Sequence, residues 1–325
     1  MSTVLVTAIG SYAGELVIVS LKRLGYQVIG CDIFPKEWIV CSKDVDKFYQ
    51  VSKSADTNRF LEEIDAICEK EKITEIIPLT DVEIDFFCQY KDYYDNKKIK
   101  VLISDVESVK ICRNKWKMDE YIRTKAIPLH LIPTVLAEKY DGISFGFPCI
   151  CKPINGRSSQ GQFVVRHASD WEYFCKEKDL SNYIVQKMIV GVVVAIDVIR
   201  DYFDNVVVVP RKELLRTKNG AGTSVEVFDD AALTEQCKCL AKSLKLTGCV
   251  CFEFILDNEG CYYFLECNAR FAGGSKFTLL AGYDCVYNHM RAFRGERIKD
   301  FKLENSMIIS RRYTEYIMRQ EACNA

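Results

Sequence analysis

Three polar side chains with the means to bind phosphate and metal, Glu266, Asn268 and Arg270, alternate along the end of an apolar run over 262–270. A β-strand points successive side chains to opposite faces, so Glu266 and Asn268 would share one face with Phe264. A carboxylate, an amide and a guanidinium at one strand end suit a site that handles phosphate and a metal ion. We therefore expect such a site near residue 268.

A second apolar run over 250–256 holds one acid, Glu253, and the turn-forming residues 257–260 separate the two runs. If those four residues are the whole loop of a hairpin, Glu253 faces Phe264 and Glu266 is its diagonal neighbour, roughly 7 Å away at Cβ. A one-residue slip would send the acids to opposite faces. The predicted hairpin therefore brings two carboxylates together.

Two like charges among apolar residues are costly unless a cation lies between them. Oxygen ligands of this kind favour Mg²⁺ or Mn²⁺. Ion pairs between the two acids and neighbouring Lys or Arg side chains would explain the same pattern. The hairpin alone leaves both interpretations open.

Composition describes an ordinary water-exposed protein of 325 residues, with 49% hydrophobic and 27% charged residues. The formal net charge of −1 predicts no nucleic-acid partner. The start at 1–6 is typical of a strand rather than a signal peptide, and no apolar stretch has membrane-spanning length. We expect a cytoplasmic protein with no membrane partner, and a homodimer is compatible with the sequence.

The 16 cysteines include no C-x-x-C pair, so we interpret them as small, reduced core residues. The three histidines lie far apart along the chain, which disfavours zinc sites and His-based triads. The chemistry is therefore expected to depend on acids, amides and basic side chains.

The order of predicted elements changes along the chain. Strands at 4–8, 27–32, 75–79 and 101–103 alternate with helices, which predicts a small doubly wound parallel sheet. After a helix over 108–125, short strands typical of antiparallel pairing follow, and a helix over 230–244 precedes the acidic hairpin. The end of the chain, from about Arg311, is expected to form a short helix and a frayed tail.

Lys152 lies at the end of an apolar strand just before Pro153, where a lysine needs an anion nearby. The loop 156–161, Gly-Arg-Ser-Ser-Gln-Gly, follows it and lies between two strands, so it is not a Walker P-loop. Its backbone and hydroxyl donors would close over phosphate oxygens as a flap, although glycine and serine loops are more often plain turns.

In sum the chain offers an N-terminal α/β domain, a strand-end lysine, a glycine and serine flap, a basic glycine loop over 211–224 and an acidic hairpin. This order resembles the ATP-grasp superfamily, nearest its carbamoyl-phosphate-synthase-like branch and with room for a single ATP-grasp unit. The matching stretches are 113–115 with 126–128, 146–153, 156–161, 186–189, 198–211, and 266–270 followed by 273–275.

The resemblance implies a pre-ATP-grasp α/β domain with a doubly wound parallel sheet over 1–108, then an α+β ATP-grasp fold over 109–306 and a tail over 307–325. The ATP-grasp part would divide into a small lid, about 126–185, and a large subdomain, about 186–306. The implied activity is an ATP-dependent ligase that converts a small carboxylate into an acylphosphate for attack by an amine or similar nucleophile. The implied cofactors are ATP and Mg²⁺ (or Mn²⁺).

The resemblance also assigns roles to residues. Lys115 and Lys152 would contact ATP phosphates, and Gly156, Ser158, Ser159 and Gly161 would form the flap. The hinge Gln186, Lys187, Met188 and Ile189 would hold adenine through backbone groups. Glu253, Glu266 and Asn268 would bind Mg²⁺, whereas Arg211 and Arg270 would neutralise the transferred phosphoryl group or the substrate carboxylate.

Lys187 and Val193 depart from the family pattern, because members commonly carry Glu at both positions, and Ala269 replaces a familiar proline. Loss of the acceptor at Val193 is worth about 1 to 3 kcal/mol and bears on nucleotide affinity or specificity. A nucleotide-binding module with weakened catalysis is therefore the alternative function.

Two further features suggest other ligands. Gly10 and Asp32 are spaced like an NAD-binding fingerprint, but the full G-x-G-x-x-G is missing, so an NAD-dependent reductase is a distant alternative. The loop is interpreted as the structural turn of the first β-α unit, with a place in the wall of the second-substrate pocket as a further interpretation. Asp81 follows a predicted strand, and we interpret it as a helix N-cap, with contact to an amine substrate as the alternative.

Overall fold

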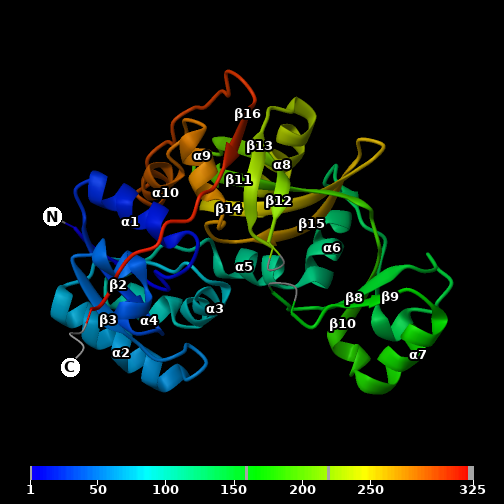
Figure 1. Ribbon diagram of the computed structural model, residues 1–325, viewed down its shortest axis with the longest axis horizontal. Coiled ribbons are helices and arrows are strands. Elements are labelled where there is room, and N and C mark those ends of the chain that lie inside the picture. Colours follow the sequence, from blue (N-terminus) through cyan, green and yellow to red (C-terminus); the bar gives the residue numbers. More distant parts are fainter. Residues whose placement is uncertain (1, 158–159, 218–219, 321–325) are drawn as a thin grey trace.

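The computed structural model describes residues 2–157, 160–217 and 220–320, which form three lobes (Figure 1). Each lobe is built on one sheet, with strand orders β3-β2-β1-β4-β5, β7-β10-β8-β9 and β16-β13-β12-β11-β14-β15-β6. The first sheet is parallel and the other two are antiparallel except for β6. This is the predicted fold class, an α/β domain followed by an α+β ATP-grasp-like architecture.

The N-terminal lobe has inner strands, β1, β2 and β4, that are buried on both faces, as is usual in parallel sheets, whereas the edge strand β3 is partly exposed. Its strands are β1 (Thr3–Val6), β2 (Gln27–Asp32), β3 (Lys47–Gln50), β4 (Glu75–Ile77) and β5 (Lys100–Val101). Its helices are α1 (Gly14–Arg23), α2 (Thr57–Glu71), α3 (Asp81–Gln89) and α4 (Lys91–Asn96), with short 3₁₀ turns η1 (Lys36–Trp38) and η2 (Val40–Lys43).

The second lobe, here called the lid, has its own small core, in which Phe174 packs against Cys149, Cys151 and Val185. Its strands are β7 (Thr134–Leu136), β8 (Cys149–Pro153), β9 (Phe163–Val165) and β10 (Tyr183–Lys187). They are covered by α7 (Ala168–Glu177) and by the 3₁₀ turns η3 (Ala137–Lys139) and η4 (Leu180–Asn182).

The third lobe contains the large sheet. Its strands are β6 (His130–Leu131), β11 (Gly191–Arg200), β12 (Val206–Arg216), β13 (Gly222–Val227), β14 (Gly248–Asp257), β15 (Tyr262–Asn268) and β16 (Met307–Ser310). The helices nearby are α5 (Val106–Arg113), α6 (Lys115–Thr124), α8 (Ala231–Ser243), α9 (Ser275–Leu280) and α10 (Cys285–Phe293). Helix α8 packs on one face of the sheet and α10 on the other, because alternate strand residues belong to two separate cores.

Two segments differ from the sequence-based expectations. The predicted tail over 307–325 contributes strand β16, which pairs with β13, and residues 311–320 contain no helix but run back over the N-terminal lobe (Figure 1). The short strand β6 lies within the predicted lid range yet pairs with β15 of the large sheet. The proposed domain boundaries remain a prediction.

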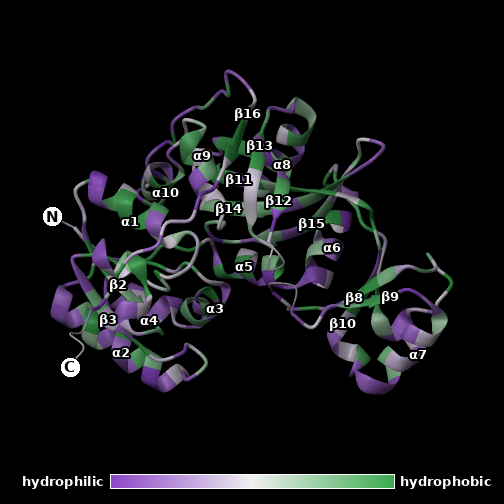
Figure 2. Ribbon diagram, in the orientation of Figure 1, coloured by the Kyte–Doolittle hydropathy of each residue, from purple (hydrophilic) through white to green (hydrophobic). Residues whose placement is uncertain are grey.

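Hydropathy follows this layering, because the middle strands of the large sheet are mostly hydrophobic and the outer helices are mixed (Figure 2). Among the described residues, no helix has the length and apolarity needed to cross a bilayer. The fifteen cysteines within the described chain are all free thiols.

Candidate functional site

The two predicted acids, Glu253 on β14 and Glu266 on β15, lie directly opposite each other across the hairpin. The predicted register was wrong, because Glu253 faces Glu266 rather than Phe264. Two one-residue shifts cause the difference. Leu256 pairs with Tyr262 instead of Cys261, and a β-bulge between positions 253 and 254 leaves Leu265 without a partner across the ladder. The carboxylates are consequently closer neighbours than the diagonal arrangement would have made them.

The bulge also corrects the predicted faces of β15. Phe264 and Cys267 belong to the same apolar core, although strict alternation would place residues three apart on opposite faces. Glu266 and Asn268 therefore point away from Phe264, not with it. The apolar face packs inward and the polar end of the strand is left for a ligand.

Asn268 connects the two acids. Its Nδ2 donates to Oε1 of Glu266 at 3.2 Å and to Oε1 of Glu253 at 3.4 Å. Its Oδ1 accepts from Nη2 of Arg270 at 3.4 Å. The three predicted metal-binding residues are thus in one cluster, with Arg270 beside it.

Basic side chains surround this cluster at longer range. Nζ of Lys115 lies 3.8 Å from Oε2 of Glu266, and Nη2 of Arg216 lies 3.4 Å from Oε2 of Glu253. These contacts are the ion pairs that the alternative interpretation required. Both are long and partly solvent-exposed, so they offset the acids' repulsion only in part.

Electrostatics indicate that the acidic cluster can accept more positive charge. Burial, with Glu266 adding repulsion, raises the pKa of Glu253 to about 7. A cation between two such carboxylates would stabilise both in the ionised form.

The donor set fits a hard divalent ion. Two carboxylates and one amide oxygen leave the remaining positions of an octahedral ion to phosphate oxygens and water, as is usual for Mg²⁺. Rotating the Asn268 amide by half a turn presents its oxygen to the acids, since amide oxygen and nitrogen are interchangeable in shape. Within the described part of the chain, no group of three or more His, Cys, Asp or Glu side chains offers a metal site, so the amide is needed.

Lys152 is buried on β8, in the lid. Glu266 and Glu253 are near enough to influence the pKa of its ammonium group. Burial lowers the pKa of its ammonium group to about 8, although Glu266 opposes the decrease. Within the described residues, Lys152 has no hydrogen-bond or ion-pair partner. A buried cation without a partner calls for an anionic ligand.

The glycine loop lies between the lid and the acidic cluster. The backbone oxygen of Gly156 accepts a hydrogen bond from Nζ of Lys115 at 2.7 Å, so this lysine connects the loop to Glu266. Gly161 has φ +71°, a conformation that favours glycine. The predicted flap residues Ser158 and Ser159 lie outside the described residues.

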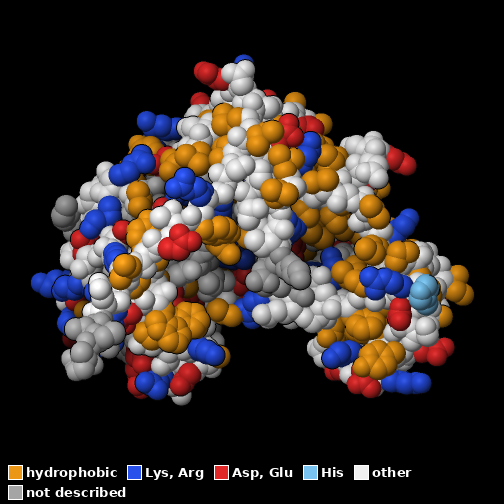
Figure 3. All heavy atoms as spheres, viewed as in Figure 1, with side chains coloured by type: hydrophobic (Ala, Val, Ile, Leu, Met, Phe, Trp, Pro, Cys, Tyr) orange, Lys and Arg blue, Asp and Glu red, His pale blue; other side chains and the backbone are white. Residues whose placement is uncertain are grey.

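The predicted hinge 186–189 joins β10 of the lid to β11 of the large sheet. Nε2 of Gln186 donates to the hydroxyl of Thr134 at 2.9 Å, whereas its buried Oε1 has no partner. The backbone N–H of Met188 donates to the carbonyl of Pro148 at 3.3 Å. A planar ligand at the hinge would therefore contact the segment that connects the lid to the large sheet. Separately, Figure 3 shows a hollow between the lid and the N-terminal lobe.

Arg211 is not among the residues brought to the cluster. It is 1% exposed, and its Nη1 lies 2.8 Å from Oδ2 of the equally buried Asp197. Nη1 also donates to the hydroxyl of Thr278 at 3.2 Å. The structure therefore places Arg211 in an internal ion pair that leaves it little access to a ligand.

Asp81 corrects another prediction. It is the first residue of α3, whose N-cap is Thr80, and it makes no cap hydrogen bond, so the N-cap interpretation was wrong. Its Oδ2 instead accepts from Nη2 of Arg270 at 2.9 Å. This ion pair connects the N-terminal lobe to the acidic cluster.

Sequence reasoning missed Arg216 as a neighbour of Glu253. The available signal was its place within the predicted basic glycine loop over 211–224, whose first part, 211–216, is in fact the end of β12. The NAD-like spacing has a structural explanation, since Oδ2 of Asp32 accepts from the backbone N–H of Gly10 at 2.8 Å. Val193 lies opposite Ile255 on the neighbouring strand, and Lys187 is exposed. The two positions where ATP-grasp proteins commonly carry Glu therefore offer no carboxylate beside the hinge 186–189.

Family models match two parts of the chain. Residues 179–315 match a model described as ATP-grasp in the biosynthetic pathway with Ter operon, and residues 4–102 match the PylC-like N-terminal domain. The match over 4–102 covers the parallel sheet, and the match over 179–315 covers the large antiparallel sheet except β6; residues 103–178, which hold most of the lid, lie between the two matches.

Curated relatives and solved structures agree on the fold. The carbamoyl phosphate synthase large chain of Clostridium acetobutylicum is 24% identical over 268 residues, which cover 77% of this chain and 24% of that protein. The formate-dependent phosphoribosylglycinamide formyltransferase of Bacteroides fragilis is 23% identical over 200 residues, 58% of this chain and 48% of that one. The chain thus spans less than half the length of either relative.

Two solved structures resemble nearly the whole chain. Biotin carboxylase from Campylobacter jejuni, in a complex with an ATP analogue, superposes with a TM-score of 0.79 at 20% identity over 94% of this chain and 74% of that one. N5-carboxyaminoimidazole synthetase from Staphylococcus aureus gives 0.73 at 16% identity over 94% of this chain and 81% of that one. At such identities these likenesses show the fold.

Proposed function

Because the chain is an ATP-grasp protein of the carbamoyl-phosphate-synthase-like branch, we propose that it is an ATP- and Mg²⁺-dependent ligase. Its substrates would be a small carboxylate, activated as an acylphosphate, and an amine or similar nucleophile. The relatives named above act in carboxylate and amine chemistry according to their names, which supports the same class of reaction here.

One observation carries this proposal. Glu253 and Glu266 face each other across the hairpin, and Asn268 lies within hydrogen-bond distance of both. A cluster with this donor set is suited to a divalent ion that also holds phosphate oxygens. Lys152, which is buried and has no partner within the described part of the chain, adds a second group that needs an anion.

The remaining residues would bind the nucleotide around that ion. Lys115 and Lys152 would contact its phosphates, the loop 156–161 would close over them, and the hinge 186–189 would hold the adenine. Bound Mg²⁺ would offset negative charge on the phosphate oxygens as the phosphoryl group is transferred. Arg270 would neutralise the substrate carboxylate or the transferred group, in exchange for Asp81.

The proposed reaction has two steps. A carboxylate oxygen forms a bond to the γ-phosphorus while the bond to the β-phosphate bridging oxygen breaks, which releases ADP. The amine nitrogen then bonds to the acyl carbon, phosphate leaves with the C–O electron pair, and the nitrogen loses a proton to solvent. The chain supplies positioning and positive charge rather than a proton-transferring histidine, as phosphoryl transfer allows.

The direct test is release of ADP and phosphate by the intact protein with Mg²⁺ and panels of carboxylates and amines. We expect release only when a member of each panel is present together with ATP. Release of phosphate at the same rate without any carboxylate would contradict a ligase and indicate a simple ATPase.

A nucleotide-binding module with weakened catalysis is the second candidate. Val193 favours it, because an aliphatic side chain on β11 offers no acceptor to a ribose hydroxyl. Tight ATP binding in calorimetry, with no turnover for any substrate pair, would support the module over the ligase.

A further inference from the structure

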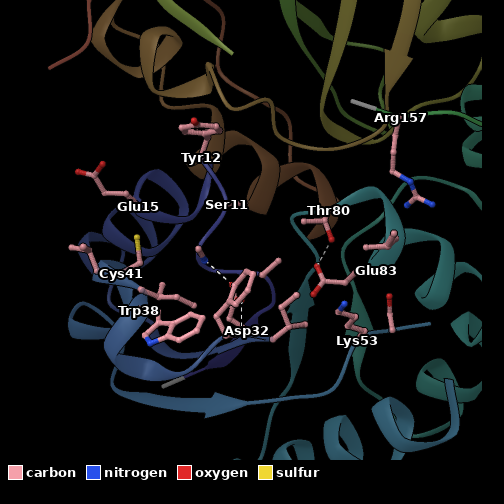
Figure 4. A pocket seen from close by; sticks show the side chains of 18 of the residues that line it. Ser11, Tyr12, Glu15, Asp32, Trp38, Cys41, Lys53, Thr80, Glu83 and Arg157 are labelled. Carbon is pink, nitrogen blue, oxygen red and sulfur yellow. Dashed lines mark hydrogen bonds between the residues drawn. The ribbon is translucent and has the colours of Figure 1, made fainter. Parts of the chain in front are cut away.

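A cavity of about 1290 Å³ opens at the carboxyl ends of the N-terminal strands, outside the acidic cluster (Figure 4). Its walls come from the segments after β1, β2, β3 and β4, from α9 and from residues 310–313. Ligands of open parallel sheets bind at this edge, where the strand order reverses, and here the reversal lies at β1, between β2 and β4. The volume is ample for a small organic molecule.

Two buried carboxylates line the cavity. Asp32 and Glu83 are each 5% exposed. Asp32 accepts hydrogen bonds from backbone N–H groups, and Glu83 accepts one from the hydroxyl of Thr80 at 2.7 Å. No lysine, arginine or histidine in the described chain forms an ion pair with either acid. Lys53 also lines the cavity and is drawn beside Glu83 in Figure 4, but among the described residues it forms no ion pair with either acid, so the two carboxylates can still accept a ligand amine.

Aromatic side chains line the other side. Phe34 and Trp38 stack with ring centroids 6.1 Å apart, and Trp38 is 73% exposed. Tyr12 is also exposed, and Figure 4 places it and Trp38 across the cavity from Glu83. Exposed, neighbouring aromatic rings of this kind are typical of a surface that stacks on a flat ligand.

The segment after β16 completes the wall. The guanidinium of Arg311 lies 5.6 Å from the ring centre of Tyr12 and 4.8 Å from that of Phe277, and it donates to the carbonyl of Gly273. The cavity is thereby enclosed by segments from both ends of the chain, and Tyr313 adds another ring to its lining.

The acidic end of the cavity adjoins the proposed reaction site. Glu83 is two residues from Asp81, which pairs with Arg270. Arg157, from the glycine loop, also lines the cavity, and its Nη1 lies 4.0 Å from Asp85. The cavity therefore extends to Arg157, the neighbour of Gly156, whose carbonyl accepts a hydrogen bond from Lys115.

We propose that this cavity binds the amine substrate, and that this substrate carries an aromatic ring on a short chain. The amine lies against Glu83 and the ring against Phe34 and Trp38. The assignment of the ligand as the nucleophile rests on the proposed ligase function, whereas its binding can be measured without ATP.

The test uses three probes with the full-length protein in the absence of ATP: 2-phenylethylamine, hexylamine, which lacks the ring, and 3-phenylpropionate, which lacks the amine. Calorimetry gives the affinities, and the quenching of tryptophan emission that is lost in Trp38→Ala reports the location, because the chain has three tryptophans. We expect 2-phenylethylamine to bind at least about tenfold more tightly than either other probe. Equal affinities, or no saturable binding, would overturn the proposal.

Three variants test which residues of the cavity bind the ligand. Trp38→Ala and Glu83→Gln should each weaken 2-phenylethylamine binding about tenfold, whereas Tyr173→Ala, which removes an aromatic side chain 57% exposed on the lid, should leave it unchanged. Trp38 is on the surface, so its variant is decisive even if the buried Glu83→Gln variant unfolds. Unchanged binding in Trp38→Ala would overturn the proposal.

The ADP-release assay separates this inference from the ligase function. Selective binding of 2-phenylethylamine without any turnover would support the cavity assignment and remove the ligase. Turnover with hexylamine as efficient as with 2-phenylethylamine would keep the ligase and overturn the proposed substrate class.

Discussion

Two groups of acids on adjacent strands of the large sheet differ in how fully their charge is matched. Asp197 on β11 is 0% exposed and accepts hydrogen bonds from Arg211, from Ser275 at 3.1 Å and from Thr278 at 2.6 Å. Among the described residues, the cation nearest to Glu253 on β14 is Nη2 of Arg216, at 3.4 Å. The first cluster is closed and holds the fold together, whereas the second is open and has capacity for a ligand.

The two clusters lie on one side of the sheet. Asp197 lies opposite Cys251, and Glu253 lies opposite Ala195. The two acids are therefore on neighbouring strands and offset by two residues along them. The same strand, β14, meets the buried His289 at Cys249. From Cys249 to Glu253 the strand therefore runs from the buried core to the proposed metal site. Residues that stabilise the fold and residues that would bind a ligand are thus only a few positions apart.

The largest effect is expected from Glu266→Gln, which removes charge from the open cluster. Turnover should fall about a thousandfold, because the cation that neutralises the phosphates loses a ligand, while the melting temperature changes little. ADP release and thermal denaturation measure the two effects. Full turnover in this variant would refute the metal assignment.

Asp197→Asn, in the closed cluster, should mainly lower the stability of the fold. It leaves Arg211 buried without a counter-ion and should lower the free energy of unfolding by about 3 to 5 kcal/mol. Chemical denaturation measures this change. Glu226→Gln is the matched control, because Glu226 pairs with Lys212 on the same sheet but both are about one-third exposed, and the expected loss is below about 1 kcal/mol. Equal losses would remove the distinction between closed and open clusters.

His289 tests the sealed end of β14. Its Nδ1 accepts from the backbone N–H of Cys249 at 3.0 Å, and burial lowers its pKa from 6.5 to about 3. The folded-state pKa is depressed, so the histidine's stabilising effect is complete above pH 6.5 and is lost as pH falls toward 3.

By about pH 4 the loss attributable to His289 should be about 3 kcal/mol. Unfolding free energies measured between pH 7 and 4 should therefore decline less steeply in His289→Gln, which keeps an acceptor for Cys249 but does not titrate. Parallel declines in the two proteins would show that other groups cause the pH dependence.

The smallest effect concerns the partial neutralisation of the open cluster. Arg216→Gln removes the cation nearest to Glu253, so the nucleotide-free protein should bind Mn²⁺ about threefold more tightly, a change of below about 1 kcal/mol. Titration followed by electron paramagnetic resonance measures this affinity. Lys212→Gln, on the same strand, should not alter it, and weaker binding in Arg216→Gln would mean that this arginine supports the ion indirectly.

The fold class could be predicted from the sequence because parallel and antiparallel strands have different patterns and because the motifs occur in a familiar order. The pairing of Glu253 with Glu266 could not be placed correctly, since the turn pairs Leu256 with Tyr262 rather than Cys261 and a bulge at Leu265, which depends on packing, adds a second shift. The burial of Arg211 was also missed, because its counter-ion Asp197 comes from another strand.

The ion pair between Arg270 and Asp81 has a thermodynamic consequence. If Arg270 exchanges Asp81 for a phosphate oxygen, the start of α3 is freed beside Glu83, so occupancy at one end changes the other. Linkage then requires reciprocity: whatever factor the cavity ligand applies to nucleotide affinity, the nucleotide applies to the cavity ligand. The order in which the two ligands arrive would therefore change the path of assembly but not its total free energy.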